Sequence, residues 1–220
     1  MKKSKRSDVD PFIVMDVMES ARIAEEKGKD IIHMEVGQPG TPAPKIAKDY
    51  ITNEINKNNL GYTVSLGLPA LRAKISKLYG DWYNLDLNPN RIVVTTGSSG
   101  AFILSFSALF DSGDRVGIGS PSYPSYRQIL KSLSLETVDI QTKLQNRFQP
   151  VPEDITNNNL NGILVASPAN PTGSMLDKQS LENLINTANE NNVSFISDEI
   201  YHGIQYENNP TSALEITDNC

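Results

Sequence analysis

The chain has 220 residues, 38% of them hydrophobic, and a formal net charge of −6 at pH 7, which suits one large domain and disfavours nucleic acid or an anionic membrane as a partner. No apolar run is long enough for a transmembrane helix, and no signal-peptide pattern is expected. The single cysteine, Cys220, excludes a disulfide scaffold and favours a reducing, cytoplasmic location.

Short apolar runs alternate with amphipathic stretches along the chain. The alternation predicts an α/β fold, with a mostly parallel sheet and helices on both faces. The run 162–166 is almost wholly apolar, as expected for a strand buried on both faces. In chain order, the patterns predict strands at 31–34, 91–95, 115–118, 136–140, 162–166 and 193–197, and helices over 68–79, 101–110, 123–133 and 176–188.

The residues that follow the predicted strands are the candidates for a site, because ligands bind beyond the carboxyl ends of parallel strands. After strand 91–95 come Ser98, Ser99 and Gly100, at the start of a helix. Small residues and free N–H groups at a helix start can hold a phosphate. An ordinary N-cap is the alternative interpretation, since serine is a preferred capping residue.

Three further strand ends carry polar or aromatic residues. Asn170 lies between two prolines that would hold its side chain in one place, although it can also be a turn residue. Asp198 ends a buried strand, where a carboxylate needs a cation or a donor unless it caps a helix. Tyr123 and Tyr201 could stack on or hydrogen-bond a planar ligand, or simply pack. Together these groups would suit a planar, phosphorylated aromatic cation.

Six short motifs are distributed along the chain: Val-Gly-Gln-Pro at 36–39, Gly-Tyr-Thr at 61–63, Thr-Gly-Ser-Ser-Gly at 96–100, Pro-Ser-Tyr-Pro-Ser-Tyr at 121–126, Ser-Pro-Ala-Asn-Pro-Thr-Gly at 167–173 and Asp-Glu-Ile-Tyr at 198–201. Through these motifs the chain resembles the class I/II aminotransferases, a family of fold-type I pyridoxal-phosphate enzymes, over nearly its whole length. The motifs occur in the family's order and at about its spacing. Asn-Pro-Thr-Gly followed by Asp-Glu-Ile-Tyr is the most specific pair.

The resemblance implies pyridoxal 5'-phosphate as the cofactor and a role for each matching residue. Asp198 would pair with the ring nitrogen and keep it protonated, since an opposite charge favours the charged form. Asn170 and Tyr201 would hydrogen-bond the phenolic oxygen. Tyr123 would stack on the ring. Ser98, Ser99 and Gly100 would bind the phosphate group.

The same resemblance implies two contacts from earlier in the chain. Gly37 would leave room for the substrate carboxylate close to the main chain. Tyr62 would reach the phosphate in a neighbouring subunit, which implies a homodimer; a packed tyrosine in an interface loop is the alternative. Residues 1–40 would belong to a small domain on the substrate side, and residues 41–220 would form an incomplete large cofactor-binding domain.

The chain departs from the family after Tyr201. The family's Schiff-base lysine follows Asp-x-x-Tyr by a few tens of residues, but this sequence continues for only 19 residues beyond Tyr201. No lysine, Lys178 included, matches that position, and the family's arginine clamp for the substrate carboxylate is also missing. No catalytic residue is therefore assigned. We expect a fragment of a longer product rather than a complete short protein that has lost catalysis.

For the intact protein, the resemblance implies amino-group transfer from an α-amino acid to a 2-oxo acid. A carbon–sulfur β-lyase on the same scaffold is an alternative, because the cofactor contacts are shared. A catalytically inert fragment is a second alternative. The effector domain of a transcriptional regulator is a third, but no basic winged helix fits before Pro11. No metal site is predicted. His33 is expected to be structural, and His202 receives no role.

Overall fold

The computed structural model describes residues 2–206 and 208–220 and divides the chain into two compact units. One unit comprises Met1–Asp10 with Pro69–Cys220, and the other comprises Pro11–Leu68. These boundaries differ from the predicted division at residue 40. The assignment of residues 1–40 to a small domain and of residues 41–220 to a large domain stays a prediction. None of the helices described in either unit is both long and apolar enough to cross a membrane.

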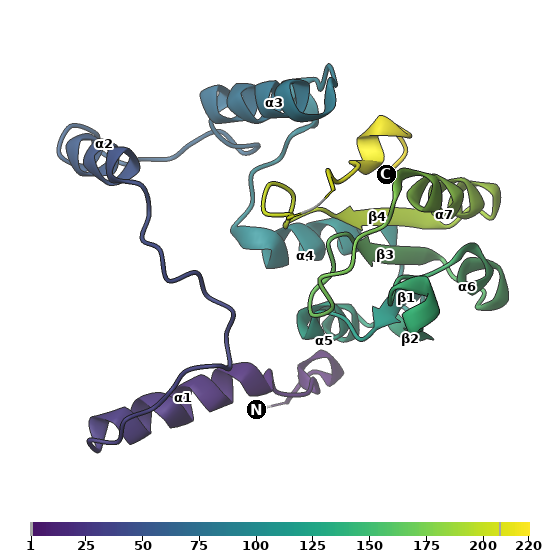
Figure 1. Cartoon of the computed structure of the whole chain (residues 1–220), viewed down its shortest axis with the longest axis horizontal. Helices are drawn as coiled ribbons and strands as arrows, with labels where there is room; N and C mark the ends of the chain where they lie inside the picture. The colour runs from purple at the N-terminus through teal and green to yellow at the C-terminus, as the bar shows by residue number, and fades with distance from the viewer. Residues whose placement is uncertain (1, 207) are drawn as a thin grey trace. The chain divides into compact units, whose positions relative to one another are not determined.

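The unit Pro11–Leu68 contains two helices, α1 (Ile13–Glu26) and α2 (Lys45–Ile55), joined by an extended segment (Figure 1). The predicted strand at 31–34 is wrong: these residues have no regular secondary structure and pair with none of the described segments, and Ile32 and Met34 are exposed. The ring of His33 lies 2.6 Å from Glu35 and 3.0 Å from Glu25. Hydrogen bonds to these two carboxylates raise the pKa of His33 to about 9.

The larger unit is built on a parallel sheet, as predicted, and this sheet is formed by four of the predicted strands. They are β1 (Arg115–Ser120), β2 (Glu136–Gln141), β3 (Gly162–Ala166) and β4 (Ser194–Asp198), arranged in the order β2-β1-β3-β4. Ala166 at the end of β3 pairs with Asp198 at the end of β4. This register brings the carboxyl ends of the two strands to the same level.

Helices cover both faces of the sheet, so it lies between two hydrophobic cores (Figure 1). Ile163 and Val165 of β3 pack into one core, and Leu164 packs into the other. The strand is therefore buried on both faces, as its apolar run predicts. The helices of this unit are α3 (Pro69–Tyr83), α4 (Gly97–Leu109), α5 (Pro124–Ser132), α6 (Pro152–Asn157) and α7 (Lys178–Glu190).

Helix α7 shows how the local sequence sets an element. Asp177 is its N-cap and accepts a hydrogen bond from the Ser180 backbone N–H at 2.8 Å, which satisfies one of the free donors of the first turn. The apolar face predicted from the sequence is buried against the sheet at Leu181, Leu184 and Ile185.

The predicted strand at 91–95 is also wrong. Pro89–Arg91 forms a 3₁₀ turn, and residues 92–95 have no regular secondary structure and pair with none of the described strands. Val93 is 51% exposed, so its apolar run is not buried as a central strand would be. Helix α4 then begins at Gly97 rather than at Ala101. Ser98 and Ser99 consequently lie inside its first turn.

Two strand glycines are required by close packing. A Cβ atom on Gly162 would lie 2.2 Å from Cζ of Phe110, and one on Gly117 would lie 2.7 Å from Cδ1 of Leu160. Both distances are far below van der Waals contact, so any side chain would displace its neighbour.

We predict that Gly162→Ala lowers the free energy of unfolding by about 1 to 3 kcal/mol, because the added methyl group overpacks the contact with Phe110. Urea unfolding of the purified protein measures the change. Gly80→Ala is the matched control: its Cβ would have ordinary contact at 3.5 Å from the Leu85 carbonyl oxygen, inside α3. There alanine should be neutral or stabilising. Equal unfolding midpoints for the two variants would contradict the packing argument.

Candidate functional site

The candidate site lies where β3 and β4 end. Because these strands are parallel and Ala166 pairs with Asp198, the loop after β3 and the turn after β4 leave the sheet at the same edge. The loop carries Asn170, and the turn carries Tyr201. The structure thus places three of the predicted residues at adjoining strand ends.

Asp198 is half-buried and is held by two donors. Its Oδ2 atom accepts a hydrogen bond from Tyr126 Oη at 2.5 Å, and its Oδ1 atom accepts one from the Ile200 backbone N–H at 3.1 Å. Within the described part of the chain, turns rather than a helix follow β4, so Asp198 is not a helix N-cap. The strand-end carboxylate has the donors that its burial requires.

Tyr126 is a residue of this site for which the sequence patterns predict no role. It lies in α5, and its side chain is only 2% exposed. Burial first, and then the Asp198 charge, raise the pKa of its phenol, so the hydroxyl stays a donor. The available signal is the spacing Tyr123–Tyr126, since residues three apart at a helix start share one face.

Tyr123 precedes α5 and lies beside Tyr126. The two ring centroids are 5.4 Å apart, at an angle of 81°. Tyr123, Tyr126 and Asp198 therefore form a continuous row from the start of α5 to the end of β4. A ring at this place could present a face to a planar ligand.

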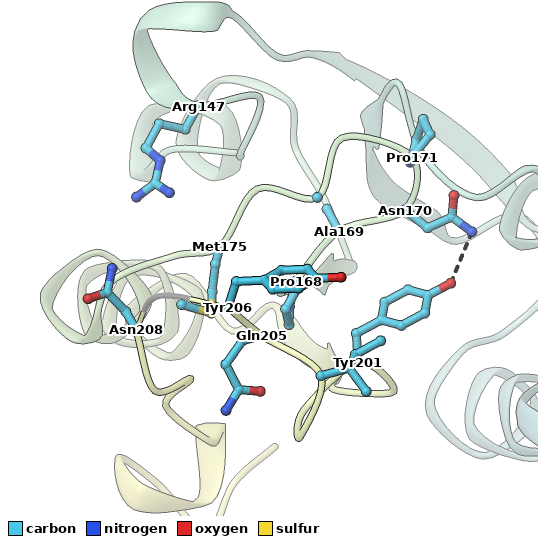
Figure 2. Close-up of a pocket in the computed structure, with 12 residues that line it drawn as sticks. Arg147, Pro168, Ala169, Asn170, Pro171, Met175, Tyr201, Gln205, Tyr206 and Asn208 are labelled. Atoms are coloured by element: carbon cyan, nitrogen blue, oxygen red, sulfur yellow. Dashed lines mark hydrogen bonds between the residues drawn. The ribbon is translucent and has the colours of Figure 1, made fainter. Parts of the chain in front are cut away.

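Asn170 and Tyr201 contact each other across the two strand ends. Asn170 Nδ2 donates to Tyr201 Oη at 3.3 Å, as Figure 2 shows. Both residues line a pocket of about 470 Å³, whose walls also include Arg147, Pro168 and Met175. A second, small cavity of about 20 Å³ is lined by both Asn170 and Tyr126, which places the amide near the row that ends at Asp198. The amide and the phenol thus converge on the edge of the sheet where Asp198 lies.

Ser98, Ser99 and Gly100 lie in the first turn of α4. The N-cap is Thr96, which makes no side-chain capping bond in the part of the chain that the structure describes, so the capping role considered for the serines is not realised. Free N–H groups at a helix start favour an anion. One turn further along α4, the ring of Phe102 packs edge-on against Tyr126 at 5.1 Å. The same aromatic row therefore connects α4 to Asp198.

Gly37 and Tyr62 belong to the other compact unit. A Cβ on Gly37 would meet no atom within 4 Å, and the Tyr62 side chain is exposed. Their contacts with the substrate and with a second subunit stay predictions. Among the described residues, no group of three or more metal-ligating side chains lies together.

Comparison with known proteins decides the family. The family model for aminotransferase class I and II matches residues 29–218. The chain belongs to the class I and II aminotransferase family. Valine–pyruvate aminotransferase of Mycobacterium tuberculosis is 40% identical over 94% of this chain and 54% of its own length. Aspartate aminotransferase of Thermotoga maritima is 33% identical over 93% of this chain and 55% of its own.

A solved structure of a putative aminotransferase from Silicibacter pomeroyi has the same fold as this chain. It is 58% identical, with a TM-score of 0.90, and the match covers all of this chain and 57% of that one. The chain therefore spans about half the length of the curated relatives and the solved structure that it matches.

The residues present fit the cofactor that this family uses, pyridoxal 5'-phosphate. The half-buried Asp198 carboxylate, with donors on both oxygens, suits a protonated ring nitrogen. The Asn170 amide and the Tyr201 hydroxyl are donors that suit a phenolic oxygen. The first turn of α4 suits a phosphate group.

We predict that Tyr126→Phe lowers the free energy of unfolding by roughly 1 to 3 kcal/mol, because it removes the donor to Asp198 without changing the packing of the ring. Chemical unfolding of the purified protein measures the loss. Tyr50→Phe is the control, since its side chain is 66% exposed. A variant Tyr126→Phe as stable as the Tyr50 control would mean that the hydrogen bond adds nothing to the fold.

Proposed function

We propose that the whole protein is a pyridoxal-phosphate-dependent aminotransferase, which moves an amino group from an α-amino acid to a 2-oxo acid, and that this chain supplies most of its cofactor contacts. The observation that carries the proposal is the convergence of Asp198, Asn170 and Tyr201 at the ends of two adjacent parallel strands. The family match supports the class of reaction. We expect the enzyme to be cytoplasmic.

Each residue of the site would act on one part of the cofactor. When bound, pyridoxal phosphate withdraws electrons from the α-carbon of the substrate. The Asp198 carboxylate would hold the proton on the ring nitrogen, because its negative charge favours the protonated form. Tyr126, through its hydrogen bond to Oδ2, would keep that carboxylate in place.

Asn170 Nδ2 and Tyr201 Oη would donate hydrogen bonds to the phenolic oxygen of the cofactor. These bonds would set the proton affinity of the groups next to that oxygen. The Tyr123 ring would cover one face of the cofactor. Phosphate would be held by the first turn of α4, through Ser98, Ser99 and Gly100.

Two further contacts belong to the same proposal. Gly37 would let the substrate carboxylate approach the main chain. Tyr62 would reach the phosphate of a neighbouring subunit, so the active form would be a homodimer with shared sites. The exposure of the Tyr62 side chain is compatible with such a contact.

The Schiff-base lysine and the arginine clamp for the substrate carboxylate would lie in a part of the whole protein that this chain does not include. The support is length: the curated relatives are almost twice as long as the region they share with this chain. The chain alone would then be inactive.

The amino acid used is not fixed by these contacts. One relative is named for valine and pyruvate and another for aspartate, although both share this region with the chain. A carbon–sulfur β-lyase would use the same cofactor contacts. Release of product from cystathionine, compared with amino transfer to 2-oxoglutarate, separates the two reactions.

We predict that Asp198→Ala in the whole protein lowers the turnover number by roughly 10³-fold, because the ring nitrogen loses the charge that keeps it protonated. Some cofactor should remain bound through the other contacts. Steady-state transamination and cofactor absorbance measure the two effects. Asp81→Ala is the control, since that carboxylate is 58% exposed on α3 and pairs with Lys77. Wild-type turnover in Asp198→Ala would refute the assigned role.

We predict that the 220-residue chain, mixed with pyridoxal phosphate, forms no stable imine absorbance band, because it lacks the lysine at the family's position. Dialysis before the spectrum is recorded removes cofactor that is loosely attached to surface lysines. The whole protein is the positive control. A stoichiometric band that survives dialysis of the chain would contradict this prediction, whereas its absence from both samples would favour a protein that does not bind the cofactor.

A further inference from the structure

Beside the candidate site, His202 occupies a buried polar network that the proposed chemistry leaves unused. Its side chain is only 4% exposed. Nε2 lies 2.9 Å from the Ser167 carbonyl oxygen, and Nδ1 lies 2.6 Å from Tyr83 Oη. The imidazole therefore bridges α3 and the loop that follows β3, two segments far apart in the sequence.

The direction of the first hydrogen bond follows from the chemistry of its partner. A carbonyl oxygen only accepts, so His202 Nε2 must carry the hydrogen and donate to Ser167. On the other side, burial raises the pKa of the Tyr83 phenol, with the charge of Glu199 as the next cause, so this hydroxyl stays protonated. Tyr83 can then donate to Nδ1, while its ring lies 5.8 Å from the imidazole.

Ser167 is the residue through which His202 reaches the site. Its N–H donates to the Asp198 carbonyl oxygen at 3.2 Å, and its Oγ accepts from the Leu176 backbone N–H at 2.9 Å. With the bond from His202, both backbone polar groups and the hydroxyl of Ser167 are engaged. Asn170 follows three residues later, so the start of its loop is fixed to β4.

Glu199 holds the turn that carries His202 through its own hydrogen bonds. The Glu199 carboxylate accepts from Ser197 Oγ at 2.9 Å, Ser212 Oγ at 2.9 Å and the Ala213 backbone N–H at 2.7 Å. Its Oε2 lies 3.8 Å from His202 Nδ1. Glu199 and His202 therefore anchor the turn, while Asp198 and Tyr201 belong to the candidate site.

We infer that His202 is a positioning residue of this site: its Nε2–H bond to Ser167 holds the Asn170 loop against the turn that carries Tyr201, and so keeps Asn170 Nδ2 within reach of Tyr201 Oη. The effect on the cofactor rests on the proposed function. The bridge itself depends only on the contacts of Tyr83, His202 and Ser167.

His202→Leu and His202→Gln in the whole protein test the inference. Leucine removes the donor to Ser167, whereas the glutamine amide can place a donor near the position of Nε2. We expect His202→Leu to lower the turnover number about 10-fold, with the KM for the amino acid changed less than about 2-fold, because the cofactor-contacting pair is displaced. We also expect a shift in the pH midpoint of the bound cofactor's visible absorbance. His202→Gln should restore most of both properties.

His33→Leu is the matched control, because this other histidine is exposed and lies in the other unit. It should leave the turnover number and the absorbance midpoint unchanged. If His202 were purely structural, His202→Leu would have a lower unfolding temperature, but its folded fraction would show the wild-type pH midpoint of the cofactor's absorbance. That result would overturn the inference. If His202→Leu fails to fold, His202→Asn, whose shorter amide does not reach Ser167, should show the same shift, and an unshifted midpoint there has the same negative meaning.

Proton–nitrogen NMR of the wild type separates this inference from the proposed function. A hydrogen-bonded Nε2–H signal that is lost in His202→Leu supports the bridge whether or not the protein transaminates. Absence of that signal in the folded wild type overturns it. A wild type that binds no cofactor refutes the proposed function, and the NMR signal then decides on the bridge alone.

Discussion

The parallel pairing of β3 with β4, with Ala166 opposite Asp198, determines which residues leave the sheet together. A register shift of one residue would turn every side chain of one strand to the other face. The two cores prevent such a shift, because Ile163 and Val165 fill one of them and Leu164 fills the other. The packing of the strand thereby fixes the relative position of the Asn170 loop and the Tyr201 turn.

The second constraint is the cost of placing a carboxylate at a half-buried strand end. An unpaired charge there would be strongly destabilising. Tyr126 and the Ile200 backbone N–H supply donors to Asp198, and Tyr123 and Phe102 pack around the Tyr126 ring. The protein therefore orients the Asp198 carboxylate before any ligand binds. Such preorganisation is expected of a site that binds a cation in one fixed position.

Local sequence patterns predicted the elements whose signal is itself local. The run 162–166 is recognisable because a strand buried on both faces is apolar throughout, and the buried face of α7 is recognisable because its apolar residues recur at helical spacing. The run 91–95 has a similar composition, yet it is no strand, because a strand also needs a neighbour to pair with, and that information is absent from the run itself. The same reason explains the wrong strand at 31–34.

The contacts of the site were partly accessible from the sequence. Asp198, Asn170 and Tyr201 were reached through strand ends and through the family's motifs, which order residues but do not show their distances. Tyr126 had a weak local signal in its spacing from Tyr123. The bond between Tyr83 and His202 joins residues 119 positions apart, and no periodicity or motif links them. Such long-range polar pairs become visible only when the chain is folded.

Two backbone hydrogen bonds, each spanning three residues, fold the turn after β4: the His202 N–H donates to the Glu199 carbonyl oxygen, and the Ile204 N–H donates to that of Tyr201. The side chains of residues 198 and 201 contact Tyr126 and Asn170, whereas those of residues 199 and 202 contact Ser212 and Tyr83. Deleting one residue between 198 and 201 would place a histidine where a phenol is needed, and inserting one would move the phenol away from Asn170. The length of this turn should therefore vary far less than its composition as sequences diverge.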